Sequence, residues 1–224
     1  MRKIDKGPEP QEWKAYRTTP NVRYQSFPFL VDSLLEEQGY ICAYCERRIP
    51  HRDAPGEEDH RIDHIITQLQ SKQQGDNLDL DYQNMVICCP GNIANNKNYY
   101  HCDKAKGHKN LTISPLSAAM MNTIGFTGTC KIMSTDKKLD DELNENGLNL
   151  NNDYLLRHRQ EAWATFVEKM GEKGWTKKHV TEALERWSSL HTFPYKGKER
   201  QAYWPFCSMI CFMLRKKLAS KTLK

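Results

Sequence analysis

Cys42-Ala43-Tyr44-Cys45 is the stretch that decides the fold of this chain, and two further cysteines, Cys89 and Cys102, follow it at a distance. Two cysteines separated by two residues can bring both thiolates to one ion from a single tight turn, because Zn–S bonds are only about 2.3 Å long. A second pair completes a tetrahedral set of four. The spacing therefore predicts one structural zinc ion bound by Cys42, Cys45, Cys89 and Cys102.

The third ligand of this set is open to two interpretations, because Cys88 directly precedes Cys89. We favour Cys89, since a Pro-Gly turn follows it, as is typical of zinc knuckles. A redox-active CxxC motif is the alternative for the first pair, but the βαβ pattern of a thioredoxin-like protein is missing. We expect the remaining cysteines to be buried free thiols: Cys130, Cys207 and Cys211.

The composition indicates a polar, moderately basic chain of 224 residues with a net charge of +5 and 38% hydrophobic residues. The longest apolar run, Phe206 to Leu214, is far shorter than the roughly 20 residues that a membrane span needs. Met1 to Lys14 is charged and polar, so no signal peptide is expected there. We therefore expect a cytoplasmic protein with no membrane partner, in which thiols stay reduced and bind metal rather than forming disulfides.

The first half of the chain is expected to contain few regular elements. Residues 1–26 show no clear period and are interpreted as an extended arm. Apolar residues at helical spacing predict a helix from Phe27 to Gln38, which ends at Gly39. Arg61 to Thr67 alternates and is β-branched, which predicts a strand with Asp63 and His64 near its end. A short helix is expected to begin at Asp103.

The second half is expected to be mainly helical. Gly125 to Thr135 is typical of a β-hairpin, and Asp136 to Asn152 is interpreted as an acidic loop. Asp153 to Met170 carries apolar residues on one face, which predicts a helix. Thr176 is the expected N-cap of a second helix, and the almost wholly apolar stretch Phe206 to Leu218 predicts a third.

A second group of residues indicates metal-assisted hydrolysis of a phosphodiester. Asp63 and His64 are neighbours between the two cysteine pairs, Asn84 stands five residues before Cys89, and Asp103 directly follows Cys102. A neutral histidine can take a proton from water. A divalent ion bound by carboxylate or amide oxygens can neutralise charge on the phosphate, and Mg²⁺ needs only one or two protein carboxylates.

The stretch from Gly39 to Lys109 resembles an HNH nuclease module, of the ββα-metal type with a zinc knuckle. The matching motifs run in the expected order: Cys42-x-x-Cys45, Asp63-His64, Asn84-Met85-Val86, Cys89 with Cys102, and Asp103-x-x-Lys106-Gly107. The sequence departs from the pattern in two ways. An Asn-rich insert splits the second cysteine pair, and the last motif position is Asp103 instead of Asn or His.

The resemblance implies a role for each of these residues. His64 is the implied general base, and Asp63 and Asp103 are the implied ligands of a catalytic Mg²⁺ or Mn²⁺ ion. Asn84 would brace the loop that carries His64, and Lys106 would lie near the scissile phosphate.

A narrower resemblance covers nearly the whole chain, which is similar to the PtuB-type HNH nucleases of Septu and retron anti-phage systems. The residues that carry it are Met1-Arg2-Lys3-Ile4, Lys6-Gly7-Pro8-Glu9-Pro10, Cys42-Ala43-Tyr44-Cys45-Glu46, His101-Cys102-Asp103-x-x-Lys106-Gly107 and Leu148-Asn149-Leu150-Asn151. That family works beside an ABC-type ATPase, PtuA. The resemblance implies an effector that is positioned or restrained by such an ATPase and cleaves nucleic acid, with DNA and RNA both open as substrates.

The expected fold class is therefore α+β, with a ββα-metal (HNH) module, a structural zinc knuckle and a mainly helical C-terminal lobe. The expected segments are an arm and helix (1–38), the nuclease module (39–112) and a partner-docking lobe (113–224). The alternative is a zinc-stabilised adaptor or nucleic-acid-binding module without catalytic activity. The plausible residues at positions 63, 64, 84 and 103 favour the enzyme.

Overall fold

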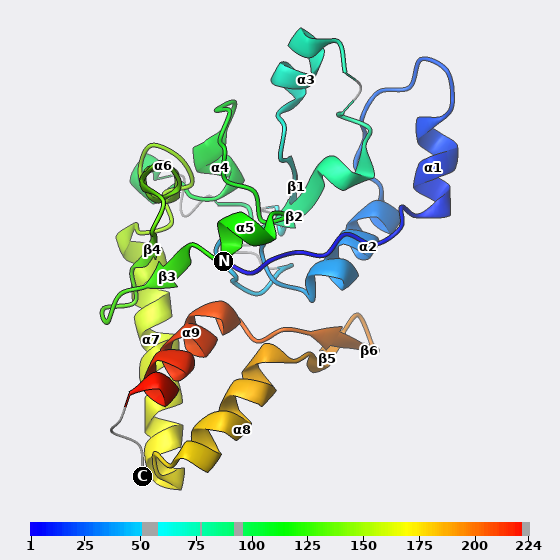
Figure 1. The fold of residues 1–224 in the computed structure, drawn as a ribbon. Helices are drawn as coiled ribbons and strands as arrows, with labels where there is room; N and C mark the ends of the chain where they lie inside the picture. The colour runs from blue at the N-terminus through cyan, green and yellow to red at the C-terminus, as the bar shows by residue number, and fades with distance from the viewer. Residues whose placement is uncertain (51–57, 77, 92–95, 221–224) are drawn as a thin grey trace.

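The computed structural model describes residues 1–50, 58–76, 78–91 and 96–220, and in these ranges it combines helices with three antiparallel two-stranded sheets (Figure 1). The mixed α+β class is as expected. The sheets pair β1 (Arg61–His64) with β2 (Met85–Cys88), β3 (Ile124–Phe126) with β4 (Ile132–Ser134), and β5 (His191–Tyr195) with β6 (Lys198–Ala202).

The β1–β2 ribbon is followed by the short helix α4 (Asp103–Lys106), and the register places Asp63 opposite Val86 and His64 opposite Met85. The strand expected over residues 61–67 ends at His64. The reason is Asn84, whose side chain accepts a hydrogen bond from the Ile66 N–H (2.8 Å) and donates one to the Ile66 carbonyl (2.9 Å). These bonds take the place of a strand ladder.

Thr67 then caps α3 (Gln68–Gln74) by accepting a hydrogen bond from the Gln70 N–H. Two short 3₁₀ turns also occur in this region. The first, η1 (Tyr82–Asn84), directly precedes β2, and the second, η2 (Lys97–Tyr99), precedes α4. The Asn-rich insert expected over residues 90–100 thus contains η2, while residues 92–95 lie outside the described ranges.

Helix α2 (Pro28–Gln38) forms as expected and ends at Gly39 with a φ of +62°. A Cβ atom at Gly39 would lie 2.5 Å from the Tyr203 ring, so glycine is needed here for space as well as for backbone conformation. The extended arm expected over residues 1–26 is wrong in part, because α1 (Gln11–Arg17) lies within it. Trp13 on α1 is fully buried and donates from Nε1 to the Leu80 carbonyl at 3.1 Å, so a tertiary contact stabilises this short helix.

The expected β-hairpin is present as β3–β4, and the short helix α5 (Ala118–Met121) precedes it. The loop expected over residues 136–152 is wrong in part, because it contains α6 (Lys137–Leu143). Asp136 caps α6 by accepting from the N–H groups of Lys138 and Leu139. Leu139 and Leu143 are buried on its inner face, which explains why this acidic stretch is helical.

The three long helices of the second half form as expected: α7 (Asp153–Lys173), α8 (Lys177–Ser188) and α9 (Cys207–Ala219). Thr176 is the N-cap of α8 and accepts from the His179 N–H. Figure 1 shows α8 and α9 packed side by side, with the unexpected β5–β6 hairpin connecting them. In the described part of the chain, every helix is too short or too polar to cross a membrane.

The three segments expected from the sequence share one cluster of buried hydrophobic residues, which extends from Met1 to Leu214. Backbone hydrogen bonds also join them. The Tyr203 N–H donates to the Gly39 carbonyl, and the Cys102 N–H donates to the Leu148 carbonyl, each at 2.9 Å. The residues after 113 are therefore packed onto the cysteine-rich segment.

Candidate functional site

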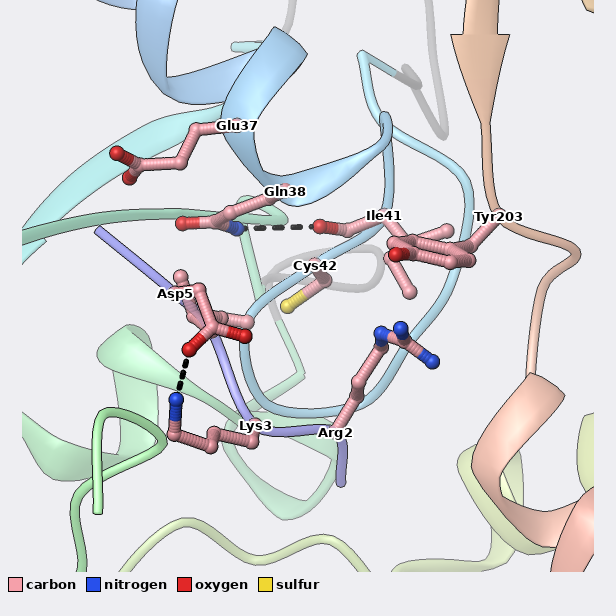
Figure 2. A pocket seen from close by; sticks show the side chains of 10 residues that line it. Arg2, Lys3, Asp5, Glu37, Gln38, Ile41, Cys42 and Tyr203 are labelled. Atoms are coloured by element: carbon pink, nitrogen blue, oxygen red, sulfur yellow. Dashed lines mark hydrogen bonds and ion pairs between the residues drawn. The ribbon is translucent and has the colours of Figure 1, made fainter. Parts of the chain in front are cut away.

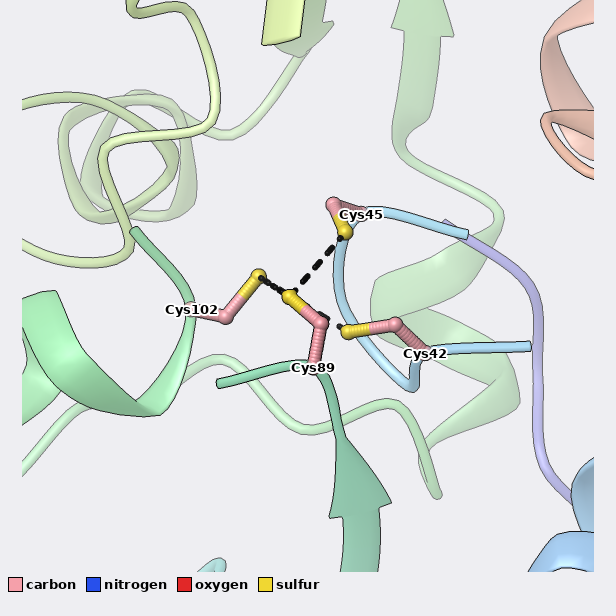
Figure 3. Close-up of side chains that lie close together, drawn as sticks. All are labelled: Cys42, Cys45, Cys89 and Cys102. Atoms are coloured by element: carbon pink, nitrogen blue, oxygen red, sulfur yellow. Dashed lines mark hydrogen bonds between the residues drawn. The ribbon is translucent and has the colours of Figure 1, made fainter. Parts of the chain in front are cut away.

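The four cysteines predicted to bind zinc converge at one buried point (Figure 3). Their sulfur atoms all lie within 4.8 Å of one another. Individual Sγ–Sγ distances are 3.6 Å for Cys45 and Cys89, and 3.7 Å for Cys102 with either Cys42 or Cys89. A tetrahedral ion with Zn–S bonds of 2.3 Å has S–S edges of about 3.8 Å, so the sulfur atoms fit a structural zinc ion. Among the described residues, no other set of three or more His, Cys, Asp or Glu side chains gathers closely enough to bind a metal.

The first cysteine pair is held by a tight knuckle. The Cys42 N–H donates to the Arg47 carbonyl at 2.9 Å, and the Glu46 N–H donates back to the Cys42 carbonyl at 3.1 Å. An isolated bridge between Ile41 and Arg48 closes the turn. The Cβ directions of the two cysteines therefore depend on backbone bonds within eight residues of sequence.

The second pair is closed by a contact across the insert. The His101 N–H donates to the Gly91 carbonyl at 3.1 Å, which brings Cys102 back to Cys89. Gly91 has a φ of +65°, and a Cβ atom there would lie 2.1 Å from the His101 carbonyl oxygen. A residue without a side chain is thus required where the two ends of the insert meet.

The structure gathers Cys89, and not Cys88, into the four-cysteine set. The Cys88 thiol instead donates to the Arg61 carbonyl at 3.5 Å, from strand β2 across to β1. The remaining cysteines, Cys130, Cys207 and Cys211, are buried and lie outside the set, as expected.

Two thiols of the set, Cys42 and Cys102, differ in how readily they ionise. Burial opposes ionisation of Cys42, yet contacts with Cys102, Cys45 and Cys89 together hold the pKa of its thiol well below the ordinary value. Burial, together with contacts to the neighbouring thiols, raises the pKa of Cys102 well above the ordinary value. Thiolates are the form of cysteine that binds zinc, so a bound divalent cation would favour ionisation of the set.

Asp63, the third residue of β1, is almost completely buried, with 5% of its surface exposed. The Lys106 ammonium donates to both of its carboxylate oxygens, at 2.9 Å to Oδ1 and 2.8 Å to Oδ2. The Tyr44 hydroxyl also donates to Oδ2. Burial and the charge of Asp63 raise the pKa of Tyr44 well above its ordinary value, so this hydroxyl keeps its proton.

His64 is buried beside Asp63, and its ring is oriented by the backbone. Nε2 lies 3.0 Å from the Asp79 carbonyl oxygen. A carbonyl oxygen only accepts hydrogen bonds, so Nε2 carries the proton and Nδ1 retains the lone pair. The Tyr24 ring packs edge-on against the imidazole at a centroid distance of 4.6 Å. Burial lowers the pKa of His64 below 6.5, which keeps the ring neutral at pH 7.

Asp103, the first residue of α4, supplies a second carboxylate close to Asp63. Burial, and next the negative charge of Asp63, raise the pKa of Asp103 to about 6. Arg61 offsets part of this effect, with a guanidinium nitrogen 3.5 Å from Asp103 Oδ2. Asp63 is buried and Asp103 is half-buried, and two carboxylates that repel each other in such a position are a favourable place for a cation.

Asn84 fixes the backbone that follows His64. Its carbonyl accepts from the Ile65 N–H at 2.9 Å, and its side-chain amide donates to the Ile66 and Leu78 carbonyls, each at 2.9 Å. With the bond from the Ile66 N–H, Asn84 satisfies several polar groups in a stretch without secondary structure. Substitution of Asn84 would therefore release the segment after β1.

Lys106 lies differently from what the sequence implied. Its ammonium group is enclosed by Asp63, by the His64 carbonyl at 2.5 Å and by the Ile65 carbonyl at 3.4 Å. Only 2% of the residue is exposed. It faces the interior of the site, whereas a contact to a scissile phosphate would need an exposed ammonium group.

Sequence reasoning did not identify three side chains that contact the site: Tyr24, Tyr44 and Arg61. Tyr44 carried a signal, because it lies inside the CxxC motif, where a buried polar group needs a hydrogen-bond partner. The contacts of Tyr24 and Arg61 depend on how distant segments pack, and no motif marks them.

A small cavity of about 70 Å³ lies between the N-terminal segment and the knuckle (Figure 2). Arg2, Lys3 and Asp5 line one side, and Gln38 and Cys42 line the other. Lys3 pairs with Asp5, and the Gln38 amide donates to the Ile41 carbonyl at 3.2 Å. This volume is far below the roughly 300–1,000 Å³ that is typical of ligand pockets.

A larger groove of about 800 Å³ lies on α7 and α8, far along the chain from the cysteines. Phe166, Met170 and Trp187 contribute apolar surface to it, and Lys169, Lys173, His179 and Arg186 contribute basic groups. Glu172 and Glu182 are the acidic side chains in its lining. Grooves of this size accommodate a ligand or a segment of another protein.

Comparison of the chain with protein-family models, with curated proteins and with solved structures finds no match.

Proposed function

We propose that this protein is a metal-dependent HNH-type endonuclease that hydrolyses phosphodiester bonds of nucleic acid. The observation that carries the proposal is the orientation of His64. Its Nε2–H is tied to the Asp79 carbonyl, its pKa is lowered, and Nδ1 is left as a neutral base beside two carboxylates. A general base needs this combination of a fixed tautomer and an unprotonated nitrogen at neutral pH.

Each residue has a role in this proposal. His64 Nδ1 accepts the proton of the attacking water, and Asn84 holds the backbone that positions His64. Asp63 and Asp103 would bind the divalent ion, Mg²⁺ or Mn²⁺, through hard oxygen ligands. When bound, this ion supplies positive charge to the phosphate and the leaving oxygen.

The arrangement of the elements supports the same proposal. An antiparallel two-stranded ribbon carries Asp63 and His64, and the helix that follows begins at Asp103. A ββα-metal module would have the same parts in the same chain order. The four-cysteine centre would be the structural zinc knuckle that holds the ribbon and the helix together.

The alternative, a zinc-stabilised adaptor or nucleic-acid-binding module without activity, is favoured by one observation. The Lys106 ammonium already contacts both oxygens of Asp63, where a catalytic ion would bind. In the active enzyme, Lys106 must share Asp63 with the ion or move away from it. In an inactive module, Lys106 is the permanent counter-ion.

The test is a cleavage assay with the purified full chain, with and without its ATPase partner. Plasmid, single-stranded DNA and total RNA are incubated with Mg²⁺ or Mn²⁺, and with neither ion. We expect metal-dependent cleavage of at least one substrate, and loss of cleavage in His64→Ala and Asp103→Asn. His60→Ala is the matched control, because His60 pairs with Asp59 rather than with the site. Metal-independent cleavage would overturn the role of the divalent ion, and no cleavage of any substrate in the presence of the ATPase would favour the adaptor instead.

We further propose that an ABC-type ATPase of the PtuA type docks on the segment 113–224, as part of an anti-phage complex. The groove on α7 and α8 supports this proposal, because its apolar floor is bordered by more basic than acidic groups. The complementary partner surface is an apolar segment that carries acidic residues. Lys169 and Lys173 are exposed and lie on the same helix, one turn apart.

Co-purification of the full chain with the tagged ATPase tests this docking surface. Lys169→Glu combined with Lys173→Glu should weaken the complex, while Lys137→Glu combined with Lys138→Glu on α6 should leave it intact. Both pairs are exposed, so neither should affect folding. Equal retention of the ATPase by both double variants would place the interface elsewhere.

A further inference from the structure

We infer that Tyr44 is a positioning residue that links the four-cysteine centre to Asp63, so that the state of the metal knuckle sets the geometry of the acidic site. The importance of Asp63 for metal binding rests on the proposed function. The physical link itself rests only on the contacts described above.

Tyr44 belongs to both sites at once. Its backbone lies inside the CxxC motif, between Cys42 and Cys45, and its hydroxyl donates to Asp63 Oδ2. Only 2% of Tyr44 is exposed. Loss of the hydroxyl would therefore remove one buried donor to Asp63 Oδ2 and leave that oxygen with its contact to Lys106.

The path between the two sites is short and rigid. The Ala43 N–H, next to Tyr44, donates to the Ile87 carbonyl at 3.1 Å, and the Ile87 N–H donates to the Gln38 side chain at 2.8 Å. Ile87 pairs with Ile62, the neighbour of Asp63 on β1. The knuckle is therefore attached to the ribbon both through the backbone and through the Tyr44 side chain.

The two donors to Asp63 differ in what controls them. Lys106 reaches the carboxylate from α4 through a long, flexible side chain. Tyr44 reaches it through a rigid ring whose origin is fixed by the neighbouring cysteines. When a cation displaces Lys106 from Asp63, or binds the Asp63 carboxylate together with Lys106, the Tyr44 hydroxyl is the contact that keeps Asp63 in place. Groups that orient a metal ligand in this way typically contribute about 10–100-fold in metal affinity or activity.

The first experiment is Mn²⁺ titration of the full chain, followed by electron paramagnetic resonance. Tyr44→Phe should weaken Mn²⁺ binding by about 10–100-fold, with zinc content and circular dichroism unchanged. In the cleavage assay, the Mn²⁺ concentration for half-maximal rate should rise by the same factor, and the rate at saturating Mn²⁺ should recover. Tyr40→Phe is the matched control, because Tyr40 is equally buried next to the knuckle but its ring contacts Phe193 and Tyr195.

The second experiment measures zinc affinity by competition with a coloured chelator and does not depend on catalysis. Wild type, Tyr44→Phe, Asp63→Asn and the double variant are compared. If Tyr44 is the link, Asp63→Asn should lower the zinc affinity measured by equilibrium competition with the chelator in the presence of Tyr44 and have no further effect in Tyr44→Phe, because coupling between the binding free energies of two sites is reciprocal. Equal effects of Asp63→Asn in both backgrounds would overturn the inference.

The outcomes separate this inference from the proposed function. Absence of Mn²⁺ binding and of cleavage in the wild type would overturn the proposed function, and the zinc-affinity comparison would still decide whether Tyr44 is the link. Mn²⁺ affinity that is the same in wild type and Tyr44→Phe would overturn the positioning role while leaving the proposed function intact.

Discussion

The four-cysteine centre and the site around His64 both adjoin the β1–β2 ribbon, where Cys89 directly follows β2 and His64 ends β1, but they satisfy their polar groups in different ways. In the first, four side chains of one chemical type converge within 4.8 Å and offer four ligand atoms to one metal ion. In the second, each group has a different partner: Asp63 has Tyr44 and Lys106, and His64 has the Asp79 carbonyl. Structural metal sites are closed by protein ligands, whereas catalytic sites keep positions that other molecules can take.

The largest effect is expected at the closed centre. Cys89→Ser removes one of four ligands, and because structural zinc contributes about 10–16 kcal/mol of binding free energy to such folds, the variant should lose zinc and fail to fold stably. Cys88→Ser is the matched control at the adjacent position and should retain one zinc ion per chain. Elemental analysis and circular dichroism measure both. Zinc loss in Cys88→Ser with retention in Cys89→Ser would exchange the roles of the two residues.

The next effect concerns the base. His64→Ala should reduce the cleavage rate by about 10²–10⁴-fold, which is the usual contribution of a general base. Zinc content should stay at the wild-type level, because His64 is not in the four-cysteine set. Initial rates at saturating Mn²⁺ provide the measurement. Wild-type rates in this variant would show that another group activates the water.

A third effect tests whether Lys106 is a counter-ion that a metal can replace. Lys106→Met leaves the buried Asp63 carboxylate without its cation, and loss of one partner of a buried pair costs about 3–5 kcal/mol of unfolding free energy. Added Mn²⁺ should restore part of this loss in Lys106→Met and have a smaller effect in wild type. Urea unfolding with and without Mn²⁺ measures both. If Mn²⁺ fails to stabilise the variant, Asp63 does not bind the ion.

The smallest effect is the dependence on pH. The pKa of Asp103 is raised to about 6, so the folded chain holds this proton over a range where the unfolded chain has lost it. The contribution of Asp103 to the stability of the metal-free protein therefore falls as the pH rises from about 4 to 6. A divalent ion favours the ionised form, so Mn²⁺ affinity should fall by up to about tenfold per pH unit below pH 6.

His64, with its pKa lowered, stays neutral down to lower pH than an ordinary histidine. The fall in Mn²⁺ affinity below pH 6 should therefore disappear in Asp103→Asn and persist in His64→Ala. A profile unchanged in Asp103→Asn would assign the titration to another group. The measurement is Mn²⁺ titration between pH 5 and 8, with zinc content checked at each pH.

The four-cysteine cluster was predictable from the sequence because thiol chemistry and the knuckle turn are both local. The Pro-Gly turn after Cys89 favoured this residue over Cys88, and the structure places Cys89 in the cluster, although its spacing to Cys102 is unusually wide. Helices α7, α8 and α9 were predictable because each has an apolar face at helical spacing. Each of these features depends on residues that lie close together in the sequence.

The features that were missed depend on contacts between distant segments. Helix α6 was missed because its acidic residues were interpreted as a loop. Its Glu142 is in fact buried and accepts hydrogen bonds from the Thr112 and Ile113 N–H groups. The β5–β6 hairpin turns at Lys196 and Gly197, both with positive φ, and this two-residue turn has lysine where asparagine is the usual signal. The buried position of Lys106 follows from how α4 packs against β1, which no motif encodes.

The contact between Gly91 and His101 has a consequence for how this chain can change in evolution. Because these two residues join the ends of the insert next to Cys89 and Cys102, the closure of the cysteine cluster is local to those two ends. Doubling the length of a flexible connection costs only about 0.6 kcal/mol in loop entropy. A change in the length of the insert should therefore cost little, provided that the Gly91–His101 contact and the hydrogen bond from Asn149 to the Tyr100 carbonyl are kept.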